Sequence, residues 1–326
     1  QSQTDLDFKA YKESTISRRI KHRMGINNIQ TLQEYHTYVM AHEEEIELMK
    51  QDFLIGVTQF FRDVEVWKEM RSSVIKQIVE EGNEETPIRI WSSGCSTGEE
   101  PYTIAILFAE VMEELKIHKH VKIFASDIDE PALTYAGIGI YPSSIDTEID
   151  EKLLHKYFNK LSDGSYQICK EIRSMVVFAT HNLIQDPPFS NMDLVSCRNT
   201  LIYLQNAAQR KAMGFFHFAL KQNGRLLLGT AETPGNLITF FEVLNGRLKI
   251  YRKSKNVRIP LSSLGDIGMN HQSHGAKLIS QFLARNIKLD TKKMSSLKIG
   301  YANLFEVFIP PTILVNKKLE VIYSYG

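Results

Sequence analysis

The sequence predicts an α/β fold in which a mostly parallel, doubly wound sheet follows an N-terminal helical region. Residues 5–80 contain no proline and carry helical patterns, whereas short apolar runs alternate with helical stretches after Pro87. One run, Ile88–Trp91, ends at a loop that holds Gly94 and Gly98, and a helical pattern follows. This order of strand, glycine loop and helix is typical of sheets that bind nucleotides at their carboxyl edge.

Seven short runs make up the predicted sheet. Five are almost wholly apolar, as parallel strands are when helices cover both faces of a sheet. They are Ile88–Trp91, Val121–Ala125, Met175–Ala179, Leu194–Ser196 and Arg225–Leu228. Two more, Phe240–Val243 and Leu248–Tyr251, are joined through Asn245-Gly246 and predict an antiparallel pair that closes the sheet. Residues 162–175, around Asp163-Gly164, predict a small β insertion.

The composition is that of a globular protein without bulk attraction to nucleic acid. The 326 residues are 43% hydrophobic and 24% charged, with a net charge of +1. Cys95, Cys169 and Cys197 form no C-x-x-C pair, which predicts neither a zinc site nor a disulfide framework. No apolar run approaches the roughly 20 residues of a membrane span, so we expect a cytoplasmic protein. The chain begins at Gln1, and we expect it to be a segment of a longer protein.

The loop within residues 90–102 lacks the patterns that bind phosphate. Neither G-x-G-x-x-G nor G-x-x-x-x-G-K-[ST] occurs there, and the loop carries Glu99 and Glu100 instead of a lysine. Two carboxylates repel phosphate but suit a ligand with an amine or cationic end. S-adenosylmethionine (AdoMet) has both an amino group and a sulfonium. The spacing by itself is equally compatible with an ordinary βα turn.

The string Ile-Trp-Ser-Ser-Gly-Cys-Ser-Thr-Gly-Glu-Glu-Pro-Tyr at residues 90–102 resembles the signature of the CheR family, the chemotaxis receptor-glutamate methyltransferases. The resemblance covers residues 5–253 and continues in Thr58–Asp63, Ser126–Asp129, Asn182-Leu183, Cys197–Tyr203 and Gly224–Glu232. It implies the AdoMet-dependent methyltransferase variant of the Rossmann-like sheet, with seven mostly parallel strands. It also implies methyl transfer from AdoMet to glutamate side chains of methyl-accepting chemoreceptors, with S-adenosylhomocysteine as the other product.

Candidate contacts to the nucleoside follow the second and third predicted strands. Asp127 ends the second strand, where an acidic residue in doubly wound folds accepts hydrogen bonds from ribose hydroxyls. Alternatively, Asp127 caps the helix that begins at Glu130, although Asp129 fits that cap better. By resemblance, Asn182 and Leu183 line the adenine.

Other candidate cofactor contacts come from the helical region and the glycine loop. By resemblance, Thr58 and Arg62 cover AdoMet and bind its methionine carboxylate, which the planar fork of an arginine matches. The loop residues Gly94, Glu99 and Glu100 complete the predicted cofactor site.

Cys197-Arg198-Asn199 lies at the carboxyl end of the fourth strand, where such sheets carry out their chemistry. By resemblance, Arg198 and Asn199 lie near the transferred methyl group, and Asn199 also contacts AdoMet. Tyr203, one turn further on, either faces the cleft or packs in the core. We expect Cys197 to be a small buried residue rather than a nucleophile, because no histidine has a recognisable pairing with it.

Residues 9–24 contain one acid and a cluster of basic residues that includes Arg18, Arg19, Lys21 and Arg23. Such a helix face is usually only solvated, but the resemblance implies docking onto the Glu-rich helices of chemoreceptors. Relatives carry a receptor-tethering β subdomain, and the sequence leaves open whether the insertion at 162–175 binds a receptor.

The composition shifts beyond residue 253. Residues 254–275 predict a linker and residues 276–289 a helix, while Thr312–Val315 and Leu319–Tyr325 predict a hairpin that resembles the start of a PAS domain. Large proteins that join CheB-like, CheR-like and PAS modules to sensor kinases have this order. The expected domains are helical (5–81), AdoMet-binding (82–253), linker with helix (254–300) and truncated PAS-like (301–326).

Two alternatives to receptor methylation stay open. Many relatives have Asn near AdoMet where this chain has Gly56. This difference and the PAS-like tail are compatible with a catalytically weak or silent AdoMet-binding regulatory domain. A methyltransferase acting on RNA or small molecules is the other. The near-neutral charge and the lack of an aromatic and basic stripe count against RNA.

Overall fold

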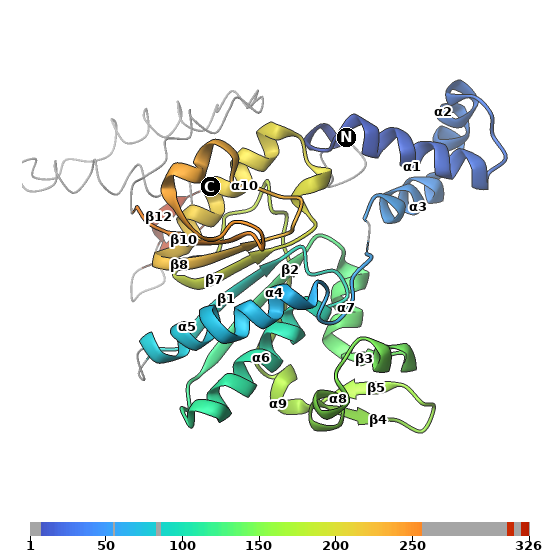
Figure 1. Cartoon of the computed structure of the whole chain (residues 1–326). Helices are drawn as coiled ribbons and strands as arrows, with labels where there is room; N and C mark the ends of the chain where they lie inside the picture. The colour runs from blue at the N-terminus through green and yellow to red at the C-terminus, as the bar shows by residue number, and fades with distance from the viewer. Residues whose placement is uncertain (1–7, 55, 83–85, 256–311, 316–320, 326) are drawn as a thin grey trace, which may run out of the picture. The chain divides into compact units, whose positions relative to one another are not determined.

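The computed structural model describes residues 8–54, 56–82, 86–255, 312–315 and 321–325. The chain divides into two compact units, Gln1–Gly265 and Asp266–Gly326. Within residues 86–255 the main sheet has the strand order β6-β2-β1-β7-β8-β10-β9 (Figure 1). The strands are β1 (Ile88–Ser93), β2 (Val121–Asp127), β6 (Val176–Thr180), β7 (Met192–Cys197), β8 (Leu220–Leu228), β9 (Phe241–Asn245) and β10 (Ile250–Lys253).

The pairing of these strands confirms the predicted fold. β1, β2, β6, β7 and β8 pair in parallel. β10 runs antiparallel to β8, and β9 antiparallel to β10. The strands are apolar at successive positions because each face of the sheet has its own core. Ile90 packs into one core and its neighbour Trp91 into the other, both fully buried.

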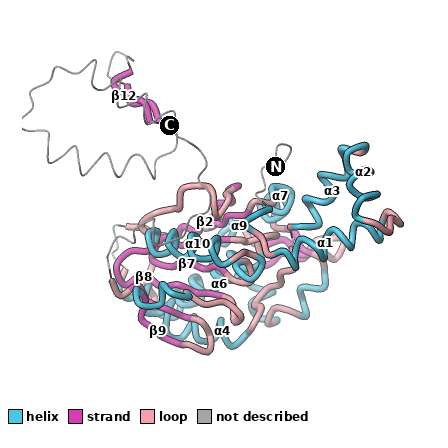
Figure 2. The backbone as a smooth tube through the Cα atoms, turned by 90° about the horizontal axis from the view of Figure 1, so that it is seen from above, coloured by secondary structure: helices cyan, strands magenta, loops and turns pink. Residues whose placement is uncertain are grey.

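Helices cover both faces of this sheet, as Figures 1 and 2 show. On one face, α6 packs against a continuous helix formed by α4, a π-helical stretch η2 and α5, while α10 packs on β7 and β8 on the other face. The helices just named are α4 (Val64–Glu69), η2 (Met70–Ile75), α5 (Lys76–Glu81), α6 (Glu99–Leu115) and α10 (Asn206–Ala219). The other helices between the strands are α7 (Glu130–Ile138), η4 (Leu201–Tyr203) and η5 (Gly235–Phe240). No helix in the described part of the chain is both long and apolar enough to span a bilayer.

The N-terminal region is helical, as expected, and has a polar cluster in its interior. It contains η1 (Phe8–Ala10), α1 (Glu13–Ile26), α2 (Leu32–Ala41) and α3 (Glu43–Phe53). The guanidinium of Arg23 donates to both carboxylate oxygens of Glu45, at 2.9 and 2.7 Å. The hydroxyl of Tyr35 also donates to Glu45, at 2.8 Å. Arg23 is buried, so it is not part of an exposed basic face, contrary to the prediction.

The β insertion between β2 and β6 is larger than the predicted segment 162–175. It is a three-stranded antiparallel sheet of order β3-β5-β4. Its elements are β3 (Ile140–Tyr141), η3 (Ser143–Thr147), α8 (Glu151–Tyr157), β4 (Phe158–Lys160), β5 (Tyr166–Ile168) and α9 (Lys170–Arg173). The first strand has two residues, too few for an alternation pattern to be recognised in the sequence.

In the second unit, β11 (Thr312–Val315) and β12 (Val321–Tyr325) pair antiparallel and confirm the predicted hairpin. The predicted helix at 276–289 and residues 256–275 of the predicted linker lie outside the described residues. The PAS-like character of the tail stays a prediction.

Replacing Glu45 by Ala should lower the free energy of unfolding by about 3 kcal/mol, because the buried Arg23 would lose the carboxylate that accepts two of its hydrogen bonds and keep only Asp52, 3.9 Å away. Hydrogen bonds from Arg23 lower the pKa of Glu45, so its stabilising contribution is complete above the unfolded value of 4.5 and is lost as the pH falls through the folded pKa. Urea denaturation followed by circular dichroism at several pH values measures both effects. Glu44→Ala, an exposed neighbour, is the control and should change stability by less than about 0.5 kcal/mol. Equal stabilities of the two variants at pH 7 would contradict this role of Glu45.

Candidate functional site

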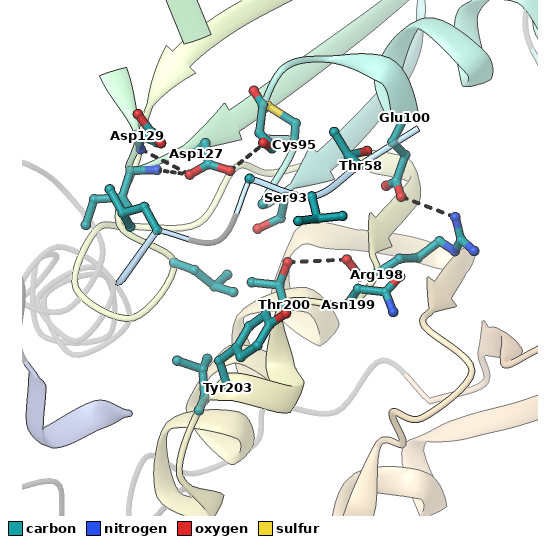
Figure 3. Close-up of a pocket in the computed structure, with 18 of the residues that line it drawn as sticks. Thr58, Ser93, Cys95, Glu100, Asp127, Asp129, Arg198, Asn199, Thr200 and Tyr203 are labelled. Atoms are coloured by element: carbon teal, nitrogen blue, oxygen red, sulfur yellow. Dashed lines mark hydrogen bonds and ion pairs between the residues drawn. The ribbon is translucent and has the colours of Figure 1, made fainter. Parts of the chain in front are cut away.

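A cavity lies at the carboxyl ends of β1, β2, β6 and β7. It is lined by the loops that follow these strands and by residues 56–59 and 62, which belong to the segment between α3 and α4. This segment, residues 56–63, is called the strap below. Figure 3 shows Thr58 of the strap, Asp127, Thr200 and Tyr203 around the same hollow. The topology therefore brings together segments that are far apart in the sequence, as expected for the carboxyl edge of such a sheet.

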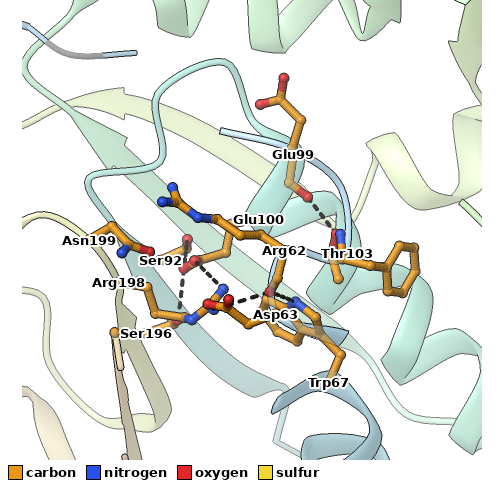
Figure 4. Close-up of polar contacts among 12 residues, drawn as sticks. Arg62, Asp63, Trp67, Ser92, Glu99, Glu100, Thr103, Ser196, Arg198 and Asn199 are labelled. Atoms are coloured by element: carbon orange, nitrogen blue, oxygen red, sulfur yellow. Dashed lines mark hydrogen bonds and ion pairs between the residues drawn. The ribbon is translucent and has the colours of Figure 1, made fainter. Parts of the chain in front are cut away.

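Most of the predicted cofactor and catalytic residues line this cavity. They are Thr58, Arg62, Gly94, Glu100, Asp127, Asn182, Leu183, Arg198, Asn199 and Tyr203. Glu99 is not among the lining residues. Its carboxylate accepts the hydroxyl hydrogen bond of Thr97 and points away from Glu100 (Figure 4), and burial raises its pKa. Neighbouring residues on a helix point in different directions, so only one of the two glutamates faces the cavity.

Asp127 has one acceptor position left for a ligand. Its Oδ1 accepts backbone N–H bonds from Ile128 (2.7 Å) and Asp129 (3.1 Å), and its Oδ2 accepts one from Ser96 (2.8 Å). A carboxylate offers about four lone-pair positions, so one on Oδ2 remains for a ribose hydroxyl. Burial raises the pKa of Asp127, while the three amide bonds favour its charged form. The helix cap predicted for Asp129 is confirmed, since its side chain accepts the N–H of Ala132.

The predicted adenine wall is a tight turn after β6. The side-chain oxygen of Asn182 accepts the backbone N–H groups of Ile184 and Gln185, at 3.0 and 3.2 Å, so it shapes the turn. The backbone N–H of Leu183 has no acceptor among the described residues and can donate to a ring nitrogen of adenine. His181, which the sequence analysis missed, also lines the cavity, and its ring is stacked on Phe189.

Gly94 is required by packing within the protein. Its φ is +72°, and a Cβ atom there would lie 2.2 Å from Oγ1 of Thr200. The loop after β1 can therefore lie against the loop after β7, which carries Asn199, only if residue 94 has no side chain. The expectation that glycine admits a ligand to the backbone is thus only part of the reason for this residue.

The guanidinium of Arg198 joins the strap to the sheet. Its side chain is 2% exposed and lies 2.6 Å from Oδ2 of Asp63 and 3.5 Å from Oε2 of Glu100. It also donates to the backbone carbonyl of Arg62 and lies over the ring of Trp67, 5.0 Å from the centroid (Figure 4). Because Nη2 is held by the strap and Nη1 lies beside Glu100, the geometry favours a positioning role for Arg198 over the predicted catalytic role, although its buried Nε has no partner among the described residues.

Glu100 is held by hydroxyl groups from two strands. Its Oε1 accepts hydrogen bonds from Ser196 of β7 at 2.7 Å and Ser92 of β1 at 3.2 Å. With Arg198 on its other oxygen, this carboxylate has a fixed direction at the edge of the cavity. It places negative charge where a ligand with an amino or sulfonium group would be stabilised.

The strap holds Arg62 in a strained stretch of backbone. Phe61 and Asp63, on either side of it, have φ values of +52° and +62°, which cost non-glycine residues about 1 kcal/mol or more each. The carbonyl of Arg62 accepts the indole N–H of Trp67 at 2.7 Å. The Nη1 of Arg62 donates to the backbone carbonyl of Val57 at 3.1 Å. The other guanidinium N–H groups have no acceptor among the described residues, so they are available to a carboxylate.

Two further residues shape the site without having been predicted from the sequence. Tyr11 lines the cavity, and burial together with the charge of Asp127 raises its pKa to about 12. The buried carboxylate of Glu232 accepts the backbone N–H groups of Gly229 (2.7 Å) and Asn199 (3.2 Å) and so fixes the loop after β7. No local pattern around either residue indicates these distant contacts.

Of the remaining predicted substrate contacts, Arg18 and Lys21 are exposed on α1, and Arg19 is half-buried there. None of them lines the cavity. Among the described residues, no group of His, Cys, Asp and Glu side chains could hold a metal ion. Cys197 is buried, and burial raises the pKa of its thiol well above the usual value.

Comparison with known families agrees with this geometry. The model of the SAM-binding domain of CheR methyltransferases matches residues 56–250, and that of the all-alpha domain of CheR methyltransferases matches residues 1–54. The chain belongs to the CheR methyltransferase family. It is an AdoMet-dependent methyltransferase, and the SAM-binding model covers the loops and the strap that line the described cavity.

Three related proteins of different lengths match this chain. The chain is 32% identical over 268 residues to chemotaxis protein methyltransferase 2 of Vibrio cholerae, covering 81% of this chain and 91% of that one. It is 33% identical over 234 residues to the chemotaxis protein methyltransferase of Borreliella burgdorferi, covering 70% and 83%. It is also 33% identical over 323 residues to an uncharacterized 104.1 kDa protein in the hypE 3′ region of Rhodobacter capsulatus. That match covers 99% of this chain but only a third of the Rhodobacter protein.

Replacing Asp127 by Asn should weaken AdoMet binding by about tenfold or more, since a charged acceptor is lost and the amide NH2 group cannot accept the backbone N–H bonds that both carboxylate oxygens accept. Isothermal titration calorimetry with AdoMet measures the dissociation constant. Asp146→Asn, an exposed position in the β insertion, is the matched control and should leave the constant unchanged. An unaltered affinity in a folded Asp127→Asn protein would refute the ribose assignment.

Proposed function

We propose that this chain transfers the methyl group of AdoMet to glutamate side chains of chemoreceptor cytoplasmic domains, forming glutamate methyl esters. The observation that carries the proposal is the cavity at the carboxyl edge of the sheet, which combines Asp127, Glu100 and Arg62 in a member of the CheR family. Relatives named as chemotaxis methyltransferases support the choice of substrate.

The proposed reaction needs no general base. Bound AdoMet supplies a methyl group on a positively charged sulfur. A glutamate with an ordinary pKa near 4.3 is already ionised at pH 7, so its oxygen can attack directly, and no proton has to move. The protein's residues must therefore align the two reactants and exclude water. Asn199 and Tyr203, which line the cavity after β7, are the candidates for orienting the glutamate.

Charge complementarity explains why Arg198 should not contact the substrate. An anionic oxygen and a cationic donor both lose charge in the transition state, so a strong cation on the glutamate would stabilise the ground state more. In the structure, Asp63 and Glu100 neutralise Arg198. The glutamate would then meet polar groups of modest strength, which favours the reaction.

A longer sensory protein is the proposed context of this segment. The match to a third of the Rhodobacter protein supports a chain in which the methyltransferase is joined to other modules, for which CheB-like and PAS modules are our candidates. We also infer a cytoplasmic location, which agrees with the free Cys95, Cys169 and Cys197. The domain boundaries at residues 81, 253 and 300 belong to the same proposal.

Methylation is tested directly by incubating the chain with radiolabelled AdoMet and chemoreceptor cytoplasmic fragments. We expect methyl groups on the receptor that are released by mild base, as esters are. At AdoMet concentrations below its dissociation constant, the signal should be about tenfold lower in Asp127→Asn. A protein that binds AdoMet but labels no receptor would contradict the proposed reaction and favour the silent regulatory domain.

The exposed part of the basic face should contribute to receptor binding. Exchanging Arg18 and Lys21 for Glu should raise KM for the receptor fragment roughly three- to tenfold at low salt and leave the dissociation constant of AdoMet unchanged. The effect should shrink at 0.5 M salt, because salt screens exposed charges. The double variant Lys68→Glu, Lys76→Glu carries the same charge change on α4 and α5 and is the control. The same rise in KM in both double variants would attribute the effect to net charge and contradict a docking role for α1.

A further inference from the structure

The strap has no regular structure of its own to fix it over the cavity. Residues 56–63 form neither helix nor strand, and Phe61 and Asp63 have positive φ values. Non-glycine residues keep such conformations only where their surroundings determine them. The contacts that anchor the strap therefore decide where Thr58 and Arg62 lie relative to the cofactor.

Helix α6 and the loop after β7 supply one set of anchors. The backbone N–H of Phe61 donates to Oγ1 of Thr103 in α6, at 3.2 Å. Arg198 bonds the carbonyl of Arg62 and the carboxylate of Asp63. These contacts hold the second half of the strap, on the side of Trp67.

The β insertion supplies a second set, on Phe60. The backbone N–H of Phe60 donates to Oε2 of Glu148, which directly follows η3, at 2.8 Å. The Phe60 ring meets Tyr141 of β3 and Phe158 of β4 edge to face, with centroids 4.9 and 5.4 Å apart. Phe60 is 1% exposed, and these two rings of the insertion form one wall of the socket in which its ring is buried.

We propose that the β insertion positions the cofactor-binding strap, with Glu148 as the positioning residue. Glu148 is not among the residues that line the cavity, so it acts through Phe60 on Thr58 and Arg62. The inference deepens the proposed function but depends only on AdoMet binding. Because coupling between sites is reciprocal, a partner that binds the insertion and shifts this socket would change the affinity for AdoMet.

Calorimetric titration of the full chain with AdoMet at 20 °C tests this role. Glu148→Ala should raise the dissociation constant about tenfold, because the released Phe60 amide lets the strap move and small displacements weaken aligned contacts strongly. Glu148→Gln keeps an oxygen that accepts the Phe60 N–H and should stay within about twofold of the wild type. Glu151→Ala, an exposed glutamate of the same insertion, is the control and should have no effect.

Phe60→Leu provides an independent second variant, since it removes the ring from the socket and leaves the Glu148 bond in place. It should also weaken AdoMet binding, and it supplies the measurement if Glu148→Ala does not fold. Thermal unfolding without AdoMet separates positioning from stability. A purely structural role would lower the melting temperature and leave the dissociation constant of the folded protein unchanged.

Wild-type affinity for AdoMet in folded Glu148→Ala or folded Phe60→Leu would overturn the inference. Loss of affinity in Glu148→Gln equal to that in Glu148→Ala would also overturn it, because the hydrogen bond would then not be the cause. Wild-type protein that binds AdoMet but methylates no receptor would contradict the proposed function. The comparison of AdoMet dissociation constants among the variants would still test the role of Glu148.

Discussion

The site depends on the contacts that the buried guanidinium of Arg198 makes with the strap and with α6. It comes from the loop after β7 and bonds Asp63 and the carbonyl of Arg62, while Glu100 from α6 lies on its other side. A buried charge is strongly destabilising when its counter-charge is removed, so the acidic partners of Arg198 have to stay close to it. This requirement fixes three separate segments relative to one another, and the cavity is the space that they enclose.

The charges around the cavity match a zwitterion better than a phosphate. Asp127 supplies negative charge at the end of β2, Glu100 at the start of α6 shares its charge with Arg198, and Arg62 supplies a planar cation from the strap. AdoMet is a nucleoside joined to a methionine, so it presents ribose hydroxyl, ammonium and carboxylate groups, which these residues complement. The proposed reaction involves no proton transfer. A rigid cofactor site therefore contributes more to the rate than any general acid or base would.

Rigidity comes partly from outside the cavity. Glu232 ties the loop that holds Asn199, and the β insertion holds Phe60 of the strap. The strained φ values of Phe61 and Asp63 show that the strap is shaped by its contacts rather than by its own preferences. An insertion that could be regarded as a separate appendage is therefore part of the architecture that supports the cofactor.

The sequence alone determined the features that depend on neighbouring residues. Apolar runs located the seven strands, Asn245-Gly246 marked the closing hairpin, and Asp129 was identified as a helix cap. The family string placed the cofactor loop after β1. Periodicity, turn preferences and capping act within a few residues, so they can be read without knowing the path of the chain.

Only the tertiary structure decided which side chains meet. It turned Arg23 inward to Glu45, directed Glu99 away from the cavity while Glu100 faced it, and brought Tyr11 beside the loops of the sheet. It also enlarged the insertion and paired Glu148 with Phe60. These outcomes depend on contacts between residues distant in sequence, and the burial and pairing of a charge are set by the whole packed environment rather than by its neighbours along the chain.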